Sequence, residues 1–172
     1  MKENSDGYIN DQSAFSSEKG SFGRHGSISE NGCGSIAAYN ALKMLGIPEK
    51  YEAVLAAFYR HTIWRGRLGA DPFYLARFLR KRGVRVKLYF RVKKVPLTHK
   101  AYIFLYDYLT GRKLGAHYAA AEYDGNAFVI YNDDSLTKRE KRVVGVAELK
   151  KEDKAKHLAV FALDLKKGLG GI

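Results

Sequence analysis

The spacing of apolar residues changes once along this chain, near residue 83, and the change restricts the folds open to it. Up to Gly83, apolar residues recur at intervals of three and four, as on one face of a helix. From Val84 onward they alternate, as in half-buried strands. Helices followed by consecutive strands predict an α+β fold, with N-terminal helices packed on a C-terminal antiparallel sheet. At 172 residues, the chain is long enough to enclose a substantial core within one domain.

Start, stop and turn signals divide this pattern into elements. Asp71-Pro72 is typical of a helix start, because an N-cap residue precedes proline at the first helical position. Gly46 is typical of a helix end, and Asp124-Gly125 is a strong hairpin-turn signal. We therefore expect helices at 33–45, 49–59 and 73–82, strands at 84–90, 101–108 and 157–165, a hairpin over 115–133, and a charged loop over 135–142.

No internal repeat or linker divides the chain, so we expect a single domain over residues 30–166. Residues 1–29 are polar and rich in Ser, Gly and Lys, with few apolar side chains. They predict an arm or loop that packs on the domain through those side chains. Residues 167–172 are glycine-rich and predict a flexible tail.

The only cysteine, Cys33, lies between two glycines at the expected start of the first helix. The first N–H groups of a helix lack intrahelical acceptors, and together with the helix dipole they favour a thiolate over a thiol. We interpret Gly32 and Gly34 as leaving the approach to the sulfur open. A small buried cysteine with only a packing role is the other interpretation, because free cysteines are often buried.

His117 begins the first strand of the predicted hairpin, and Asn132-Asp133 ends the second. The start of one hairpin strand lies beside the end of the other, so an amide or a carboxylate is expected near the ring of His117. A thiolate at a helix start and a histidine oriented in this way form an arrangement suited to covalent catalysis by cysteine.

Three short segments together resemble the papain-like cysteine peptidases. They are Asn-Gly-Cys-Gly at 31–34, Gly-Ala-His-Tyr at 115–118 and Tyr-Asn-Asp at 131–133. The closest resemblance is to the bacteriocin-processing, double-glycine peptidase type and its free-standing relatives. Gly-Ala-Asp-Pro at 69–72 and the apolar residues after it are similar to the middle segment of that group. The resemblance covers residues 30–133.

The resemblance implies a papain-like fold and a thiol hydrolase that cleaves peptide or related amide bonds of a peptide or protein substrate through an acyl-enzyme. Cys33 would be the nucleophile, His117 the general base and acid, and Asp133 the third member that orients the ring. Asn132 is the alternative third member, because papain itself uses an amide there. No cofactor is implied, and one cysteine with five dispersed histidines offers no metal-site spacing.

One position departs from the family pattern. The family has glutamine six residues before the cysteine, where its side chain helps to bind the oxyanion, but this chain has Ser27. Ser27, Asn31 and Gln12 are the candidates to replace that donor, beside the backbone N–H of Cys33. Loss of an oxyanion donor costs on the order of 100- to 1000-fold in rate. A second function therefore stays open, namely a weak or inactive peptidase-like module that binds a peptide or an anionic partner.

The chain carries 30 basic and 18 acidic residues, a formal net charge of +12, which attracts anionic partners. The basic side of the predicted helix 73–82 is the candidate docking surface, although such a run is often only a solvated face. The basic loop 64–69 contains Trp64, which we expect to cover the core rather than line a substrate cleft.

Composition and the N-terminal sequence favour a cytoplasmic protein. One cysteine cannot form an internal disulfide, which suits a reducing compartment. No signal peptide and no segment long enough to span a membrane are visible. The residues do not distinguish hydrolysis from acyl transfer or deamidation, and they do not indicate an oligomeric state.

Overall fold

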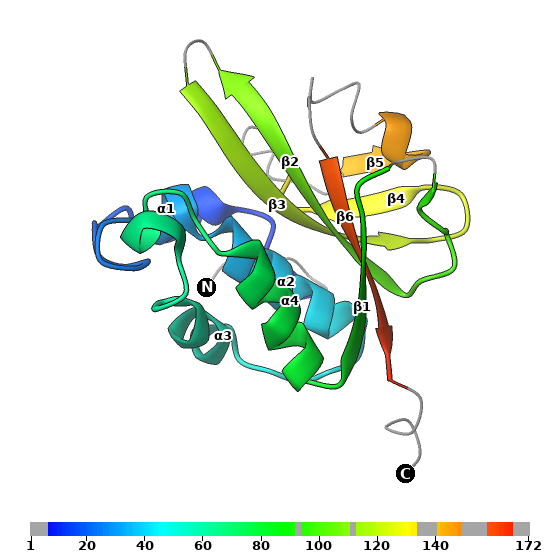
Figure 1. Ribbon diagram of the computed structural model, residues 1–172, viewed down its shortest axis with the longest axis horizontal. Helices are drawn as coiled ribbons and strands as arrows, with labels where there is room; N and C mark the ends of the chain where they lie inside the picture. Colours follow the sequence, from blue (N-terminus) through cyan, green and yellow to red (C-terminus); the bar gives the residue numbers. More distant parts are fainter. Residues whose placement is uncertain (1–6, 92–93, 111–112, 134–140, 149–157, 167–172) are drawn as a thin grey trace.

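The computed structural model describes residues 7–91, 94–110, 113–133, 141–148 and 158–166 of the chain. The helical elements come first and the strands follow, as expected (Figure 1). The helical elements are η1 (Gln12–Ala14), α1 (Ile28–Asn31), α2 (Cys33–Met44), α3 (Tyr51–Phe58), η2 (Ile63–Gly66) and α4 (Pro72–Lys81).

The strands form one six-stranded sheet in the order β1-β6-β2-β3-β4-β5, and every neighbouring pair is antiparallel. They are β1 (Val84–Tyr89), β2 (Ala101–Thr110), β3 (Lys113–Tyr123), β4 (Phe128–Tyr131), β5 (Lys141–Val143) and β6 (Leu158–Leu165). The predicted α+β arrangement of helices packed on an antiparallel sheet is confirmed. The predicted loop over 135–142 is wrong at its end, because β5 pairs with β4 there. Two consecutive basic residues, Lys141 and Arg142, begin β5, so its sequence lacks the alternation of apolar residues that predicts a strand.

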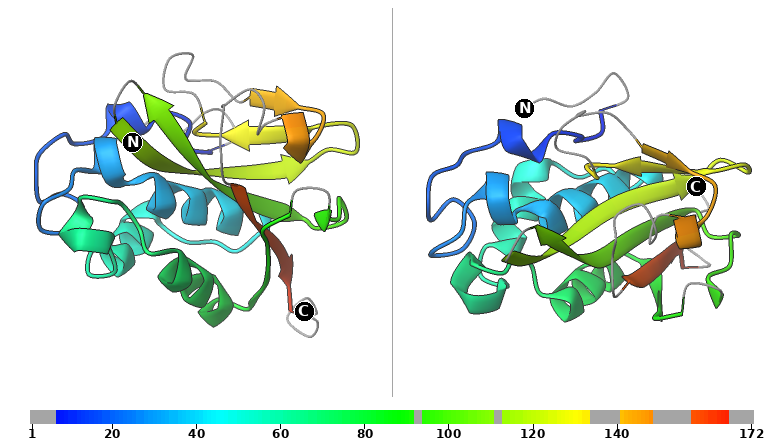
Figure 2. Two further views of the ribbon diagram at one scale, coloured as in Figure 1. Left: turned by 45° about the horizontal axis from the view of Figure 1, so that its top comes forward. Right: turned by 90° about the horizontal axis from the view of Figure 1, so that it is seen from above.

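Helix α2 is the central element of the fold. It contacts β2 and β3 on one side and α3 and α4 on the other (Figures 1 and 2). Ten of its twelve residues, Cys33 to Leu42, are buried. A helix buried on all sides has no single polar face, and its many small residues allow close approach to the sheet. Because Cys33 is the first residue of α2, the core fixes its position.

The glycines around Cys33 are required by packing. A Cβ on Gly34 would collide with the Cβ of Ala70 and would touch the ring of Tyr118. A Cβ on Gly32 would lie 2.6 Å from the carbonyl oxygen of Ile28. The structure therefore gives these glycines a packing role, in place of the open approach to the sulfur that the sequence suggested.

The described part of the N-terminal arm is fastened by polar contacts as well as apolar ones. The side-chain amide of Asn40 in α2 accepts from the N–H of Ile9 at 3.0 Å and donates to its carbonyl at 2.9 Å. The ring of Tyr8 lies 4.3 Å from that of Tyr131, and Phe22 is fully buried. The arm therefore lies against both α2 and β4. The boundary at residue 29 stays a prediction, and the tail at 167–172 lies outside the described residues.

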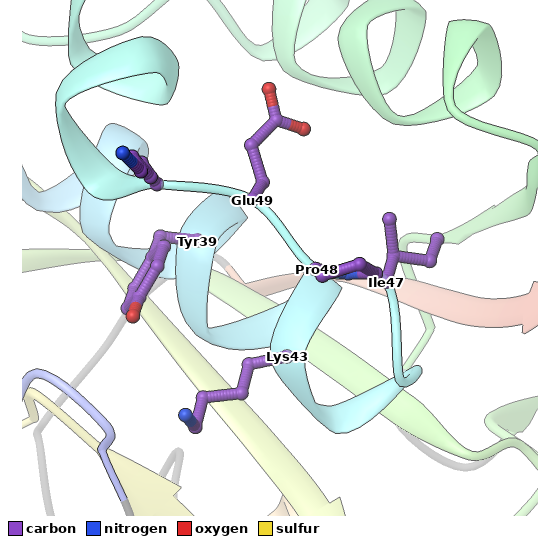
Figure 3. Close-up of a pocket in the computed structure, with 6 residues that line it drawn as sticks. Tyr39, Lys43, Ile47, Pro48 and Glu49 are labelled. Carbon is purple, nitrogen blue, oxygen red and sulfur yellow. The ribbon is translucent and has the colours of Figure 1, made fainter.

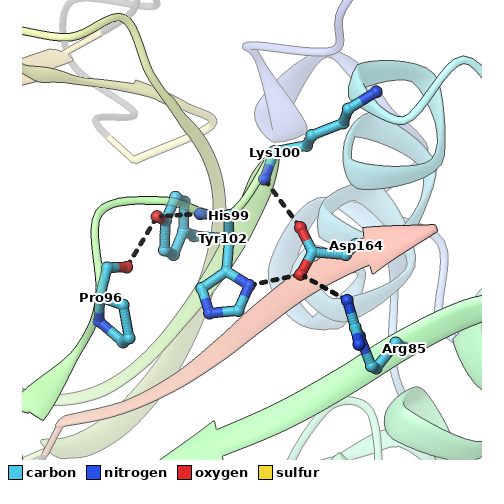
Figure 4. Close-up of polar contacts among 6 residues, drawn as sticks. All are labelled: Arg85, Pro96, His99, Lys100, Tyr102 and Asp164. Atoms are coloured by element: carbon cyan, nitrogen blue, oxygen red, sulfur yellow. Dashed lines mark hydrogen bonds and ion pairs between the residues drawn. The ribbon is translucent and has the colours of Figure 1, made fainter. Parts of the chain in front are cut away.

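A polar cluster joins the chain before β2 to β6 (Figure 4). The Nδ1 of His99 lies 2.6 Å from a carboxylate oxygen of Asp164, and the Lys100 N–H donates to the other oxygen at 3.3 Å. Arg85 of β1 lies 3.6 Å from the same carboxylate. The cluster thus links β1, β6 and the start of β2.

Within the described parts of the chain, none of the helices combines the length and the apolar character needed to cross a membrane.

Gly34→Ala is expected to lower the free energy of unfolding by about 1–3 kcal/mol, because the added methyl group overpacks the contact with Ala70. Helix propensity alone would favour alanine by about 1 kcal/mol, so a net loss must come from the collision. Urea unfolding followed by circular dichroism measures the change. Gly145→Ala is the control, because a Cβ there meets nothing within 4 Å. Equal stability of the two variants would contradict the prediction.

Candidate active site

Cys33 lies at the junction of α1 and α2, and polar groups act on its sulfur. As the first residue of α2, it presents a backbone N–H that has no acceptor within that helix. Hydrogen bonding from the backbone N–H groups of Gly34 and Tyr118 lowers the pKa of the thiol. Only 4% of the residue is exposed. The burial is therefore not burial under hydrocarbon alone, as a purely packing cysteine would have.

His117 lies in β3, opposite Tyr106 of β2, and its ring is near enough to the sulfur of Cys33 for each group to shift the pKa of the other. Its Nε2 lies 2.5 Å from the backbone carbonyl oxygen of Asn132. A carbonyl only accepts hydrogen bonds, so Nε2 carries the proton and Nδ1 is left to face the sulfur. The structure thus brings together the two residues that the sequence selected for covalent chemistry.

The two groups shift each other's ionisation. Burial raises the pKa of Cys33, but the hydrogen bond and the charge of His117 outweigh it, so that the pKa of the thiol lies below its ordinary value. Burial lowers the pKa of His117, but the sulfur, the Asn132 carbonyl and the charge of Asp133 raise it to about 8. Both shifts favour a thiolate beside an imidazolium.

The two candidates for the third member act on the histidine in different ways. Asn132 holds the ring through its backbone carbonyl, not through its side chain. The carboxylate of Asp133 accepts a hydrogen bond from the hydroxyl of Tyr106 and acts on His117 through its charge. Tyr106 also packs its ring 5.7 Å from that of His117. Sequence reasoning missed Tyr106, and only the β2–β3 register could have found it.

Asn132 is held from the N-terminal arm. Its φ of 61° is left-handed, a conformation that asparagine tolerates better than most residues. Its N–H donates to the side chain of Asn10 at 2.8 Å. Its side-chain oxygen accepts from the N–H of Gln12 at 3.0 Å, and its amide nitrogen donates to Oε1 of Gln12 at 3.3 Å. These contacts fix the direction of the carbonyl that meets His117.

Gln12 also contacts α1, which leads into Cys33. Its Nε2 donates to the carbonyl oxygens of Ile28 at 3.0 Å and Ser29 at 3.1 Å. Both N–H bonds of its amide are thus used within the protein. Gln12 therefore joins the segment that precedes the cysteine to the residue that orients the histidine.

Ser27 and Asn31, the other two oxyanion candidates, differ in how their hydrogen-bonding groups are used. Ser27 is fully buried, and its hydroxyl oxygen lies 3.3 Å from that of Ser29. Asn31 accepts from the N–H of Ser27 at 3.2 Å and donates one amide N–H to the carbonyl of Arg67 at 3.1 Å. The amide nitrogen of Asn31 carries a second N–H, which the contacts within the described residues leave available.

The described residues contain no group of three or more His, Cys, Asp or Glu side chains that could hold a metal ion.

Comparison with known proteins finds similarity among solved structures only. No family model matches this chain, and no curated protein matches it. One similar structure is the peptidase domain of Streptococcus ComA, a bifunctional ABC transporter involved in a quorum-sensing pathway. It is 16% identical, with a TM-score of 0.47, and the match covers 76% of this chain and 90% of that chain.

Two further structures are similar. A double-glycine-motif protease from an AMS/PCAT transporter, in complex with the leader peptide, is 14% identical with a TM-score of 0.49, covering 76% of this chain and 83% of that chain. The peptidase domain of Streptococcus mutans ComA with a small-molecule inhibitor is 15% identical with a TM-score of 0.40, covering 64% and 88%. All are peptidase or protease domains, the group that the sequence resembles. With such identities, and with TM-scores below 0.5, they assign neither a family nor an activity to this chain.

The rate of alkylation of Cys33 by iodoacetamide is expected to rise with pH with an apparent pKa below about 8.5, the value for an unperturbed thiol. The reason is that the pKa of Cys33 is lowered in the folded protein, so the reactive thiolate forms at lower pH. His117→Ala removes the group that lowers the pKa of Cys33 and leaves the burial that raises it. The apparent pKa of Cys33 should therefore rise, and its alkylation rate at pH 7 should fall at least about tenfold. Stopped-time labelling from pH 5 to 10 with mass spectrometry measures both. Superimposable profiles for the two proteins would exclude the pairing.

Gln12→Ala is expected to lower the free energy of unfolding by about 1–3 kcal/mol, because it leaves polar groups of Ile28, Ser29 and Asn132 without their partner. It should also move the apparent pKa of Cys33 toward its ordinary value. Urea unfolding and alkylation profiles measure the two effects. Ser13→Ala, an exposed neighbour in η1, is the control, and equal effects of both substitutions would refute the role of Gln12.

Proposed function

We propose that this protein is a thiol hydrolase of the cysteine peptidase type, which cleaves peptide or related amide bonds. The supporting observation is that the ring of His117 and the sulfur of Cys33 shift each other's pKa, while Nε2 of His117 lies 2.5 Å from the carbonyl oxygen of Asn132. A nucleophile, a base and a group that orients the base are the three parts that covalent catalysis requires.

Acylation would start from the thiolate of Cys33. The sulfur attacks the substrate carbonyl carbon, a C–S bond forms, and the electron pair of the C=O bond moves onto the oxygen. The N–H of Cys33 and the second amide N–H of Asn31 are the proposed donors to that oxyanion. The imidazolium of His117 then gives its proton to the leaving nitrogen as the C–N bond breaks, which leaves an acyl-enzyme and a free amine.

Deacylation uses the same groups, with His117 now accepting a proton instead of donating one. Neutral His117 takes a proton from water while the water oxygen attacks the thioester carbon. The C–S bond breaks, the carboxylic acid leaves, and the thiolate beside an imidazolium is restored. The charge of Asp133, which raises the pKa of His117, supports the protonated ring at both stages.

Peptide binding without turnover is the second candidate function. It is favoured by the serine at position 27, where the family has the oxyanion glutamine, and by the 4% exposure of Cys33. The two functions differ in one observable, namely whether new peptide ends appear.

A proteome-derived peptide library with blocked N-termini tests for turnover. The wild-type protein is expected to generate new N-termini, which mass spectrometry identifies, and Cys33→Ala is expected to generate none. His117→Ala should lose at least about 100-fold in rate, the lower range of general acid–base effects.

His61→Ala is the matched control, because His61 stacks on Tyr74 and is not among the residues that contact Cys33 or His117. It should retain full activity. Absence of new N-termini with wild-type protein would favour the binding function, and cleavage that survives Cys33→Ala would show that the site is wrongly assigned. Circular dichroism confirms that each variant is folded.

A further inference from the structure

An open pocket of about 320 Å³ lies between the N-terminal arm and η2, lined by His25, Trp64, Arg65 and Arg67. Trp64 was expected to cover the core, but this prediction is wrong, because 73% of the residue is exposed. The largest aromatic side chain of the protein therefore contributes to a surface pocket instead of the interior. Packing in the core therefore does not explain the position of Trp64.

The backbone of this pocket is strained. Trp64 has φ 48° and ψ 48°, and Arg65 has φ 56° and ψ 32°, so two consecutive non-glycine residues are left-handed. This conformation is unfavourable for bulky residues, and it persists only where the surroundings impose it. Strain of this kind is concentrated at binding and catalytic sites.

Contacts between residues 22–26 of the N-terminal arm and η2 impose this conformation. The N–H of His25 donates to the carbonyl of Arg65 at 2.8 Å. A Cβ on Gly66 would collide with the carbonyl of Phe22, and one on Gly26 would collide with that of Gly66. The loops pack backbone against backbone, so the pocket is held in its shape before any ligand arrives.

The pocket is lined by cationic side chains, and no ion pair within the described residues neutralises them. Desolvation and the charges of Arg67, Arg24 and Arg65 all lower the pKa of His25. Among the described residues, none of these three arginines forms an ion pair with a carboxylate. Guanidinium groups bind carboxylates with two parallel hydrogen bonds, which suits an acidic ligand.

The loop that carries the pocket contacts both sides of the candidate active site. The carbonyl of Arg67 accepts from the side chain of Asn31, two residues before Cys33. The carbonyl of Ala70 accepts from the hydroxyl of Tyr118, the residue after His117. A ligand held in the pocket would therefore lie beside the segment that presents the sulfur.

Two other candidate surfaces are less suitable. At the end of α4, Arg82 is bound to Glu49 by two contacts of 2.5 Å and stacks on Phe78, and Arg80 donates to the carbonyl of Val86. A hollow of about 430 Å³ includes Glu49 and Lys43 (Figure 3). It lies near the end of the twelve-residue α2, about 15 Å along the helix from Cys33.

We propose that the pocket of His25, Trp64, Arg65 and Arg67 is a specificity subsite that binds an acidic side chain of the peptide substrate. Arg65 and Arg67 bind the carboxylate, and the indole of Trp64 packs on the adjoining part of the peptide. The part of this proposal that concerns cleavage rests on the proposed function, whereas binding itself does not require turnover.

Trp64 is the only tryptophan of the chain, so its fluorescence reports on the pocket without a label. Cys33→Ala protein is titrated with hexaglutamate at low salt, with hexaglutamine as the uncharged probe. Hexaglutamate should change the emission in a saturable manner, weakening as salt is added, and hexaglutamine should not. No response to hexaglutamate, or an equal response to both peptides, would overturn the proposal.

Arg67→Gln removes one pocket cation but keeps the backbone carbonyl that contacts Asn31, and it should weaken hexaglutamate binding about tenfold. Arg77→Gln, which removes an exposed cation from α4, should leave the affinity unchanged. Equal losses in both variants would show a non-specific charge effect and refute the site. Tighter binding of hexathymidylate in competition would assign the pocket to nucleic acid instead. Because the titration uses inactive protein, its result is independent of the library test for turnover.

Discussion

The pairing of the imidazole of His117 with the sulfur of Cys33, in which each group shifts the pKa of the other, is the interaction on which the rest of the structure depends. Both groups are largely removed from water, where an isolated charge would be very unfavourable. A pair of opposite charges is tolerated there only with good geometry and further hydrogen bonds. On the sulfur side the N–H groups of Gly34 and Tyr118 lower the pKa of the thiol, and on the ring side the Asn132 carbonyl accepts a hydrogen bond. Small residues along α2 allow the helix to approach β3 closely enough for the contact.

The N-terminal arm belongs to this arrangement and is not an appendage. Asn40 receives the backbone of Ile9 inside the core, so that the next residues of the arm reach the end of β4. Asn10 and Gln12 then satisfy the polar groups of Asn132 in its left-handed conformation. The polar side chains of three distant segments thereby determine where one carbonyl points. Gln12 thereby connects the segment that precedes Cys33 to the residue that orients His117.

The sequence predicted the layout because periodicity, caps and the Asp124-Gly125 turn are local signals. The meeting of Cys33 and His117 also followed from local rules, since a helix start and a hairpin each place one side chain. The role of Gln12 could not be predicted, because its partner Asn132 is 120 residues away and no spacing rule links them. Tyr106 required the strand register. The left-handed backbone of Trp64 and Arg65 is imposed by contacts with the arm, and their own identities favour another conformation.

The position of β6 has a consequence for how the protein is made. β6 lies between β1 and β2, which precede it in the chain, so a ribosome must synthesise residues 158–165 before the sheet can join its two parts. Until then β1 has no strand neighbour, and α4, which packs on β1, rests on an incomplete layer. The β2–β3 hairpin can form earlier, but the nascent chain can reach its full stability only after β6 has been inserted between β1 and β2.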